Sequence, residues 1–97
     1  MIYIVKFLPE AQGDLKDIHT YLSQFYEGTA GRFFSALKIS IENLKSNPFM
    51  AQVYTKRLPY RRLIVGDYIV LYKIDENKTL IEIHRILHGS RDINRYI

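Results

Sequence analysis

Two groups of cationic side chains are the strongest candidates for chemistry in this sequence. The first group precedes and enters an apolar stretch and consists of Lys56, Arg57, Arg61 and Arg62. The second group lies in and after the last apolar stretch and consists of Arg85, Arg91 and Arg95. Guanidinium and ammonium groups bind phosphate and stabilise the extra negative charge of a phosphorane. The two groups therefore point to a nucleic-acid substrate or to an acidic protein partner.

The net charge supports the same interpretation. It is +4 for the 97 residues, with His neutral. Residues 1–55 carry equal numbers of basic and acidic side chains, so the whole excess lies in residues 56–97. A basic half beside a neutral half suits an acidic partner. Plain solubility explains a charge of this size equally well.

Arg85 stands against the local apolar pattern. In a regular strand its side chain would lie on the same face as those of Ile81, Ile83 and Leu87. A guanidinium there faces the apolar side unless it is paired, lies at the edge of a cleft, or is released to solvent by a bulge in the strand. The next segment, residues 88–92, favours a structural corner in which Asp92 caps the last residues.

Metal and cofactor sites are not predicted. There is no cysteine, and the three histidines have no acidic residue at the offset of a zinc motif. His84 and His88 are four apart on an expected strand, where that spacing does not bring two side chains together. No glycine-rich phosphate loop and no G-x-S-x-G nucleophile turn occurs.

The apolar periodicity predicts one domain over residues 1–97, of the α+β class. A strand over residues 2–7 precedes a helix that begins at Pro9, whose apolar stripe is Ala11, Leu15, Ile18, Leu22 and Phe25. Thr29 is the expected N-cap of a second helix, which Asn47-Pro48 ends. After a loop over residues 49–60, strands are expected at residues 61–65, 68–74 and 80–87. This β-α-α-β-β-β order predicts a helical hairpin packed on one face of a small curved, mainly antiparallel sheet.

The strand over residues 68–74 is apolar on both sides, which makes it central. The helices cover one face only. Closure of the other face by sheet curvature is favoured over cover by loops or by a partner. Tyrosines suit the less covered face, so Tyr68 and Tyr72 are expected at a binding surface.

No stretch is long and apolar enough to cross a membrane, and the first residues lack the features of a signal peptide. We therefore expect a cytoplasmic protein without membrane contact.

Three segments resemble the RelE/ParE superfamily of toxins. Residues 60–74 resemble the hairpin signature of the superfamily, and residues 83–92 resemble its closing strand in the RxLHGxRD form of ParE-like members. Ala11, Asp14, Leu15 and Ile18 with Tyr21-Leu22 resemble the usual first helix, and Asn47-Pro48 resembles the end of the second. The resemblance spans essentially the whole chain.

The resemblance implies the toxin of a type II toxin–antitoxin system, with the fold described above. Such a toxin is neutralised by a cognate antitoxin and contacts operator DNA only through that antitoxin. ParE-like members inhibit DNA gyrase, whereas RelE-like members enter the ribosome and cut messenger RNA. The ParE-like branch is favoured, because residues 46–60 contain no acid and only Lys56 and Arg57 loosely match the RelE-like lysines.

The candidate residues divide between two roles. Metal-independent RNA cleavage, the alternative activity, would use Arg61, Arg85, His88, Arg91 and Tyr96. Target or antitoxin binding would use Lys56, Arg57, Arg62, Tyr68, Tyr72 and Arg95. A plain nucleic-acid-binding module is a further alternative, disfavoured because the aromatic residues lie at core periodicity.

Overall fold

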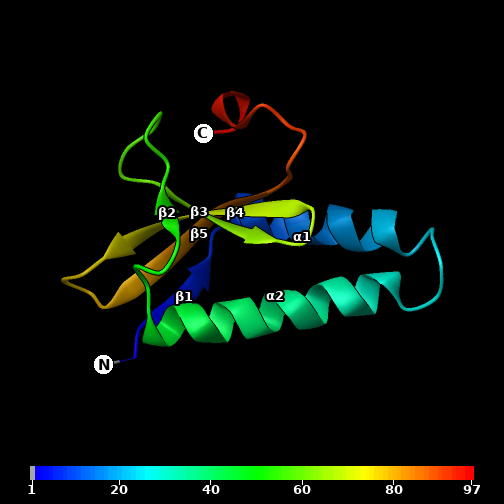
Figure 1. Cartoon of the computed structure of the whole chain (residues 1–97), viewed down its shortest axis with the longest axis horizontal. Coiled ribbons are helices and arrows are strands. Elements are labelled where there is room, and N and C mark those ends of the chain that lie inside the picture. Colours follow the sequence, from blue (N-terminus) through cyan, green and yellow to red (C-terminus); the bar gives the residue numbers. More distant parts are fainter. Residues whose placement is uncertain (1) are drawn as a thin grey trace.

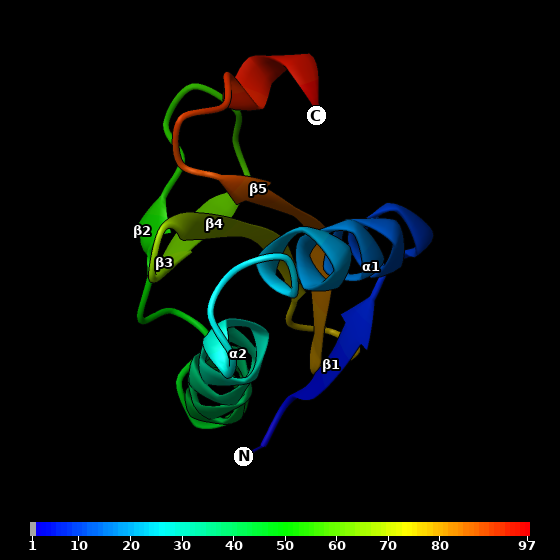
Figure 2. The ribbon, with the colours of Figure 1, turned by 90° about the vertical axis from the view of Figure 1, so that its right-hand side faces the viewer.

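The computed structural model describes residues 2–97 as two helices packed on a five-stranded sheet (Figure 1). In chain order the elements are β1 (Ile4–Phe7), α1 (Pro9–Leu22), α2 (Thr29–Ser46), β2 (Gln52–Val53), β3 (Arg61–Val65), β4 (Tyr68–Asp75), β5 (Leu80–His88) and the 3₁₀ turn η1 (Ile93–Arg95). The helices lie together on one side of the sheet, while η1 lies on the other side (Figure 2). The predicted α+β class and element order are confirmed.

The sheet order is β1-β5-β4-β3-β2, and one of its pairings is parallel. Strands β3, β4 and β5 form the predicted antiparallel meander. β1 pairs in parallel with β5, from Ile4 opposite Leu80 to Phe7 opposite Ile83. A two-residue strand, β2, lies in the segment predicted as a loop and pairs with Arg61 and Arg62. The sheet is therefore mixed and open, with β4 well inside it.

Both helix termini nearest the hairpin turn differ from the prediction. α1 ends at Leu22, so Phe25 lies beyond the helix and is 51% exposed. The N-cap of α2 is Gly28, not Thr29, and its φ of 84° is a conformation that glycine adopts without strain. Thr29 is instead the first helical residue, and its hydroxyl donates to the carbonyl of Tyr26.

The main core lies between the helices and the sheet. Its buried side chains include Ala11, Ile18, Leu37, Ile41, Leu44, Leu63, Val65, Val70, Ile81, Ile83 and Ile86. Tyr68 and Tyr72 also belong to this core. The expectation that these tyrosines occupy the less covered face is therefore wrong. Tyr72 is fully buried, and its hydroxyl donates to the carbonyl of Pro48 at 2.8 Å. This hydrogen bond satisfies a carbonyl that lies just beyond the end of α2.

We expect Tyr72→Phe to lower the free energy of unfolding by about 1 kcal/mol, because the Pro48 carbonyl loses its donor in a buried place. Urea denaturation at neutral pH measures this loss. Tyr26→Phe is the control, since Tyr26 is exposed and should show no change. Equal stability of Tyr72→Phe and the original protein would contradict the assignment.

A second, smaller core covers the opposite face of the sheet. Its members are Tyr60, Ile69, Leu71, Leu87 and Ile93, with Tyr54, Tyr96 and Ile97 packed against them. These side chains come from β4, β5, the loop before β3 and the C-terminal segment. The favoured prediction of closure by curvature alone is therefore wrong, and cover by the loop and the C-terminal segment takes its place.

Residues 2–97 include no helix with the length and apolarity of a membrane span, and no cluster of three or more potential metal-ligating side chains.

Candidate functional site

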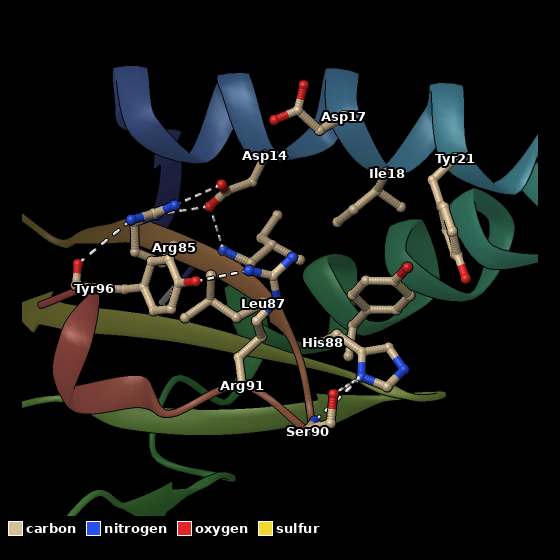
Figure 3. Close-up of a pocket in the computed structure, with 12 residues that line it drawn as sticks. Asp14, Asp17, Ile18, Tyr21, Arg85, Leu87, His88, Ser90, Arg91 and Tyr96 are labelled. Carbon is tan, nitrogen blue, oxygen red and sulfur yellow. Dashed lines mark hydrogen bonds and ion pairs between the residues drawn. The ribbon is translucent and has the colours of Figure 1, made fainter.

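A cavity of about 530 Å³ lies between α1, the end of β5 and the C-terminal segment (Figure 3). The residues around it are Asp14, Asp17, Ile18, Tyr21, Tyr68, Arg85, Ile86, Leu87, His88, Ser90, Arg91 and Tyr96. β1 pairs with β5 only as far as Ile83, so the rest of β5 has an open edge here. Four of the five predicted catalytic residues line this cavity, and Arg61 does not.

A bulge in β5 determines how Arg85 is placed. Leu71 pairs with Arg85 but Tyr72 pairs with Ile83, so His84 is the extra residue. A bulge reverses the alternation of side chains beyond it. Ile83 and Ile86 therefore both lie in the main core, whereas Leu87 lies in the second core. The alternation expected from the sequence therefore breaks at this bulge: Arg85 and Leu87 share a face with each other, but not with Ile81 and Ile83.

Asp14 of α1 pairs with Arg85 and also with the backbone of β5. Its two oxygens accept from Arg85 Nη2 at 2.7 Å and Nε at 2.8 Å, and Oδ2 also accepts from Ile86 N–H at 2.9 Å. The Arg85 and Asp14 side chains are 20% and 11% exposed. The hydrogen bond with Asp14 raises the pKa of Arg85 above its ordinary value, against the opposing effect of burial. Arg85 is thus a cation neutralised within the fold.

Tyr96 of the C-terminal segment contacts both arginines of the cavity. Its ring lies under the Arg85 guanidinium at 5.0 Å, a cation–π distance. Its hydroxyl accepts from Arg91 Nη1 at 2.7 Å. Within residues 2–97 the ion pairs involve Lys45 and Arg85 only, so Arg91 has no carboxylate partner. Arg91 is therefore the available cation of the cavity.

His88 is held by the turn that follows β5. The Ser90 backbone N–H donates to His88 Nδ1 at 3.2 Å, and the Ser90 hydroxyl lies 2.7 Å from the same nitrogen. A nitrogen that accepts from a backbone N–H carries no proton in the neutral ring, so the proton is on Nε2. His88 also packs edge-on against Tyr68, with ring centroids 5.4 Å apart.

The other predicted residues lie elsewhere. Lys56, Arg62 and Arg91 border a second hollow of about 700 Å³, beside Tyr54 and Asn94. Arg57 and Arg95 border neither cavity. Arg61 donates to the carbonyls of Ala51 at 2.7 Å and Phe49 at 3.5 Å, and its guanidinium lies over the Phe49 ring. Tyr72 is fully buried, which leaves it no surface for a partner.

The sequence model of one family, described as the ParE toxin of the type II toxin–antitoxin system parDE, matches residues 5–93. The chain belongs to this family. It is a toxin of the RelE/ParE superfamily, of the kind found in type II toxin–antitoxin systems. No curated protein sequence matches it.

Solved structures of both branches share the fold of this toxin. The chromosomal ParDE system of P. aeruginosa matches with a TM-score of 0.70 and 16% identity, over 90% of this chain and 96% of that one. RelBE2 of Mycobacterium tuberculosis matches at 0.64 and 21%, over 91% and 99%. The E. coli RelBE complex matches at 0.58 and 12%, over 92% and 99%. At these identities the likeness shows the fold alone.

Asp14, Asp17 and Tyr21 of the toxin's cavity were not among the predicted site residues. Asp14 was predicted only as part of the family pattern of the first helix. A signal was nevertheless present: Asp14 and Ile18 are four apart, so they share a helix face, and Ile18 belongs to the apolar stripe. An acidic side chain beside a buried apolar stripe requires a cationic partner. Arg85 was the cation on an apolar face for which no partner was predicted.

His84, the bulged residue, is a half-buried histidine of the toxin outside the cavity. Its Nδ1 lies 3.2 Å from the Tyr60 hydroxyl, while its buried Nε2 has no hydrogen-bond partner. Burial, followed by the charge of Lys73, lowers the pKa of His84 below its usual 6.5, although Glu82 and Glu10 oppose this. The folded state therefore favours the neutral ring.

Toxin stability should consequently fall on acidification below pH 6.5, the ordinary His pKa. The unfolded chain then binds a proton that folded His84 resists, so acid favours unfolding. Melting temperatures at neutral and mildly acidic pH test this. His84→Asn, which keeps a polar atom near Tyr60, should lose less stability over that pH range. A variant with the same pH dependence as the original chain would contradict the role of His84.

Proposed function

We propose that this protein is a ParE-like toxin that acts in the cytoplasm by binding and inhibiting DNA gyrase, and that a cognate antitoxin neutralises it. The observation that carries the proposal is the pairing of Arg85 with Asp14. Asp14 binds the Arg85 guanidinium, which would otherwise be the natural catalytic cation.

Metal-independent RNA cleavage requires a base, an acid and a cation that reach one phosphate together. Here Arg85 is neutralised by Asp14, and Arg61 donates to backbone carbonyls away from the cavity. His88 uses Nδ1 within its own turn. The arrangement thus supports a role in binding, with Arg91 and Tyr96 as the polar groups exposed to a target.

The alternative is a RelE-like ribosome-dependent mRNA endoribonuclease. One contact favours it: Arg91 lies 2.7 Å from the Tyr96 hydroxyl, and His88 lines the same cavity. A cation beside a phenol, with an imidazole nearby, could stabilise the charged phosphorane and protonate the leaving oxygen of the phosphodiester. This alternative predicts that Arg91→Ala and His88→Ala abolish cutting while both variants remain folded.

The proposed antitoxin has an acidic stretch that lies over the hollow bordered by Lys56, Arg62 and Arg91. The related structures from P. aeruginosa, M. tuberculosis and E. coli are of toxin–antitoxin systems, which supports such a partner. Operator DNA is then contacted through the antitoxin only.

Purified toxin incubated with gyrase and plasmid DNA tests the proposal. We expect blocked supercoiling or trapped cleaved plasmid, and loss of either effect when an excess of antitoxin is added. Gyrase that supercoils plasmid normally at a large excess of folded toxin would refute the proposed target. A gyrase preparation challenged with heat-unfolded toxin is the control.

A further inference from the structure

Two phenol groups attach the loop between β2 and β3 to the rest of the fold. This loop, residues 54–60, lies beside the C-terminal segment (Figure 1). The Tyr54 hydroxyl lies 3.2 Å from Asn94 Oδ1 of η1, and the Tyr60 hydroxyl lies 3.2 Å from His84 Nδ1 of β5. Both tyrosine rings also pack in the second core. The position of the loop therefore depends on what these two phenols contact.

His84 lies where its ring accommodates a positive charge poorly. The ring packs edge-on against Tyr60 with centroids 5.1 Å apart, and its buried Nε2 has no hydrogen-bond partner. On the same tyrosine, Lys73 Nζ lies 4.6 Å from the ring centroid. An imidazolium carries a proton on both nitrogens, so protonation places a donor at Nε2 without an acceptor. It also brings a second cation to the ring that Lys73 already contacts.

Two carboxylates favour a different position for the charged ring. Burial and then Lys73 of β4 lower the pKa of His84, whereas Glu82 of β5 and Glu10 of α1 raise it. Among residues 2–97, the ion pairs include neither of these two acids, although Lys6 of β1 lies opposite Glu82. His84 is the extra residue of the bulge, which the regular ladder does not pair. The ring thus has a neutral position against Tyr60 and a charged position near the two acids.

We propose that His84 is a pH-sensitive switch whose protonation turns the ring toward Glu82 and Glu10, breaks its contact with Tyr60 and releases the β2–β3 loop from the sheet. The loop carries Lys56 to the hollow that Arg62 and Arg91 also border. Its release separates one cation from the other two. The proposal goes beyond the proposed function, and neither gyrase nor the antitoxin enters the argument.

The loop can open without the rest of the sheet because its backbone hydrogen bonds are internal. Tyr54 N–H donates to the Tyr60 carbonyl at 2.7 Å, Tyr60 N–H to the Arg57 carbonyl at 3.0 Å, and Arg57 N–H to the Tyr54 carbonyl at 3.1 Å. β4 and β5, in contrast, pair along their whole length. A segment with few contacts to the core opens at a lower free energy than the whole domain.

Amide hydrogen exchange of the full chain by NMR tests the switch. The reporters are the three internal amides of the loop, at Tyr54, Arg57 and Tyr60, with Val70 of β4 as the reporter of global unfolding. Protection is compared at neutral pH and at about pH 5, where a free imidazole is charged, after correction for intrinsic exchange rates. We expect loop protection to fall about tenfold on acidification, and to stay below that of Val70 at both pH values.

Three variants assign the effect to His84. His84→Asn removes the titrating ring and should make loop protection independent of pH. His19→Asn, at an exposed histidine of α1, should keep the full response. Lys73→Gln removes the nearby cation, so the charged ring is better tolerated and the fall in protection should be smaller.

The proposal is overturned if loop protection in the original chain does not depend on pH, or if His84→Asn retains the original dependence. Loop amides that exchange only together with Val70 would likewise overturn it, because the opening would then be global. Gyrase inhibition is measured separately at neutral pH, so it stands or fails independently of these results.

Discussion

Asp14→Asn should lower the free energy of unfolding by about 3 kcal/mol, because it leaves the Arg85 guanidinium without a counter-charge in a mostly buried place. The amide can still accept from Ile86 N–H or from Arg85, so the fold should persist in a weakened form. The loss comes from the uncompensated charge, since removal of one partner from a buried pair costs more than the pair contributes.

Urea denaturation of three variants separates this explanation from a general weakening of α1. Asp17→Asn changes an exposed carboxylate on the same helix and should alter stability by less than about 0.5 kcal/mol. The double variant Asp14→Leu/Arg85→Met replaces the pair with apolar groups and should recover much of the loss. If Asp14→Asn is as stable as the original protein, the ion pair does not hold α1 to β5.

Leu44→Ala should lower the free energy of unfolding by about 3 kcal/mol as well, since Leu44 is fully buried in the main core and its removal leaves a cavity. The matched control is Ile39→Ala on the same helix, where the side chain is 63% exposed. Both variants are measured by urea denaturation with a common slope. Similar losses for Leu44→Ala and Ile39→Ala would show that α2 does not pack through the face assigned here.

The fold could be predicted because its elements are defined by local patterns. The second helix, its end at Asn47-Pro48 and the strands over residues 61–65 and 68–74 each depend on neighbouring residues only. The parallel pairing of β1 with β5 depends on residues more than seventy positions apart, and strand composition alone does not specify it. The cover of the second face likewise depends on where Ile93 and Tyr96 return to the sheet.

The candidate site was predicted in part for the same reason. Arg85, His88, Arg91 and Tyr96 lie within twelve residues of one another, so one strand and one turn bring them together. Arg61 was grouped with them by residue type, but its strand places it beside the carbonyl of Ala51. Asp14 was missed because its partner, Arg85, is 71 residues away, and Arg85 is oriented by a bulge that was only one of several possibilities predicted for this strand.

Cleavage of a defined message on translating ribosomes is the most direct test of the central claim that Arg85 serves the fold and not RNA chemistry. We expect the purified toxin to leave the message intact, and the folded Asp14→Leu/Arg85→Met variant to do the same. Codon-positioned cuts by the original protein that disappear in this folded double variant would contradict that claim.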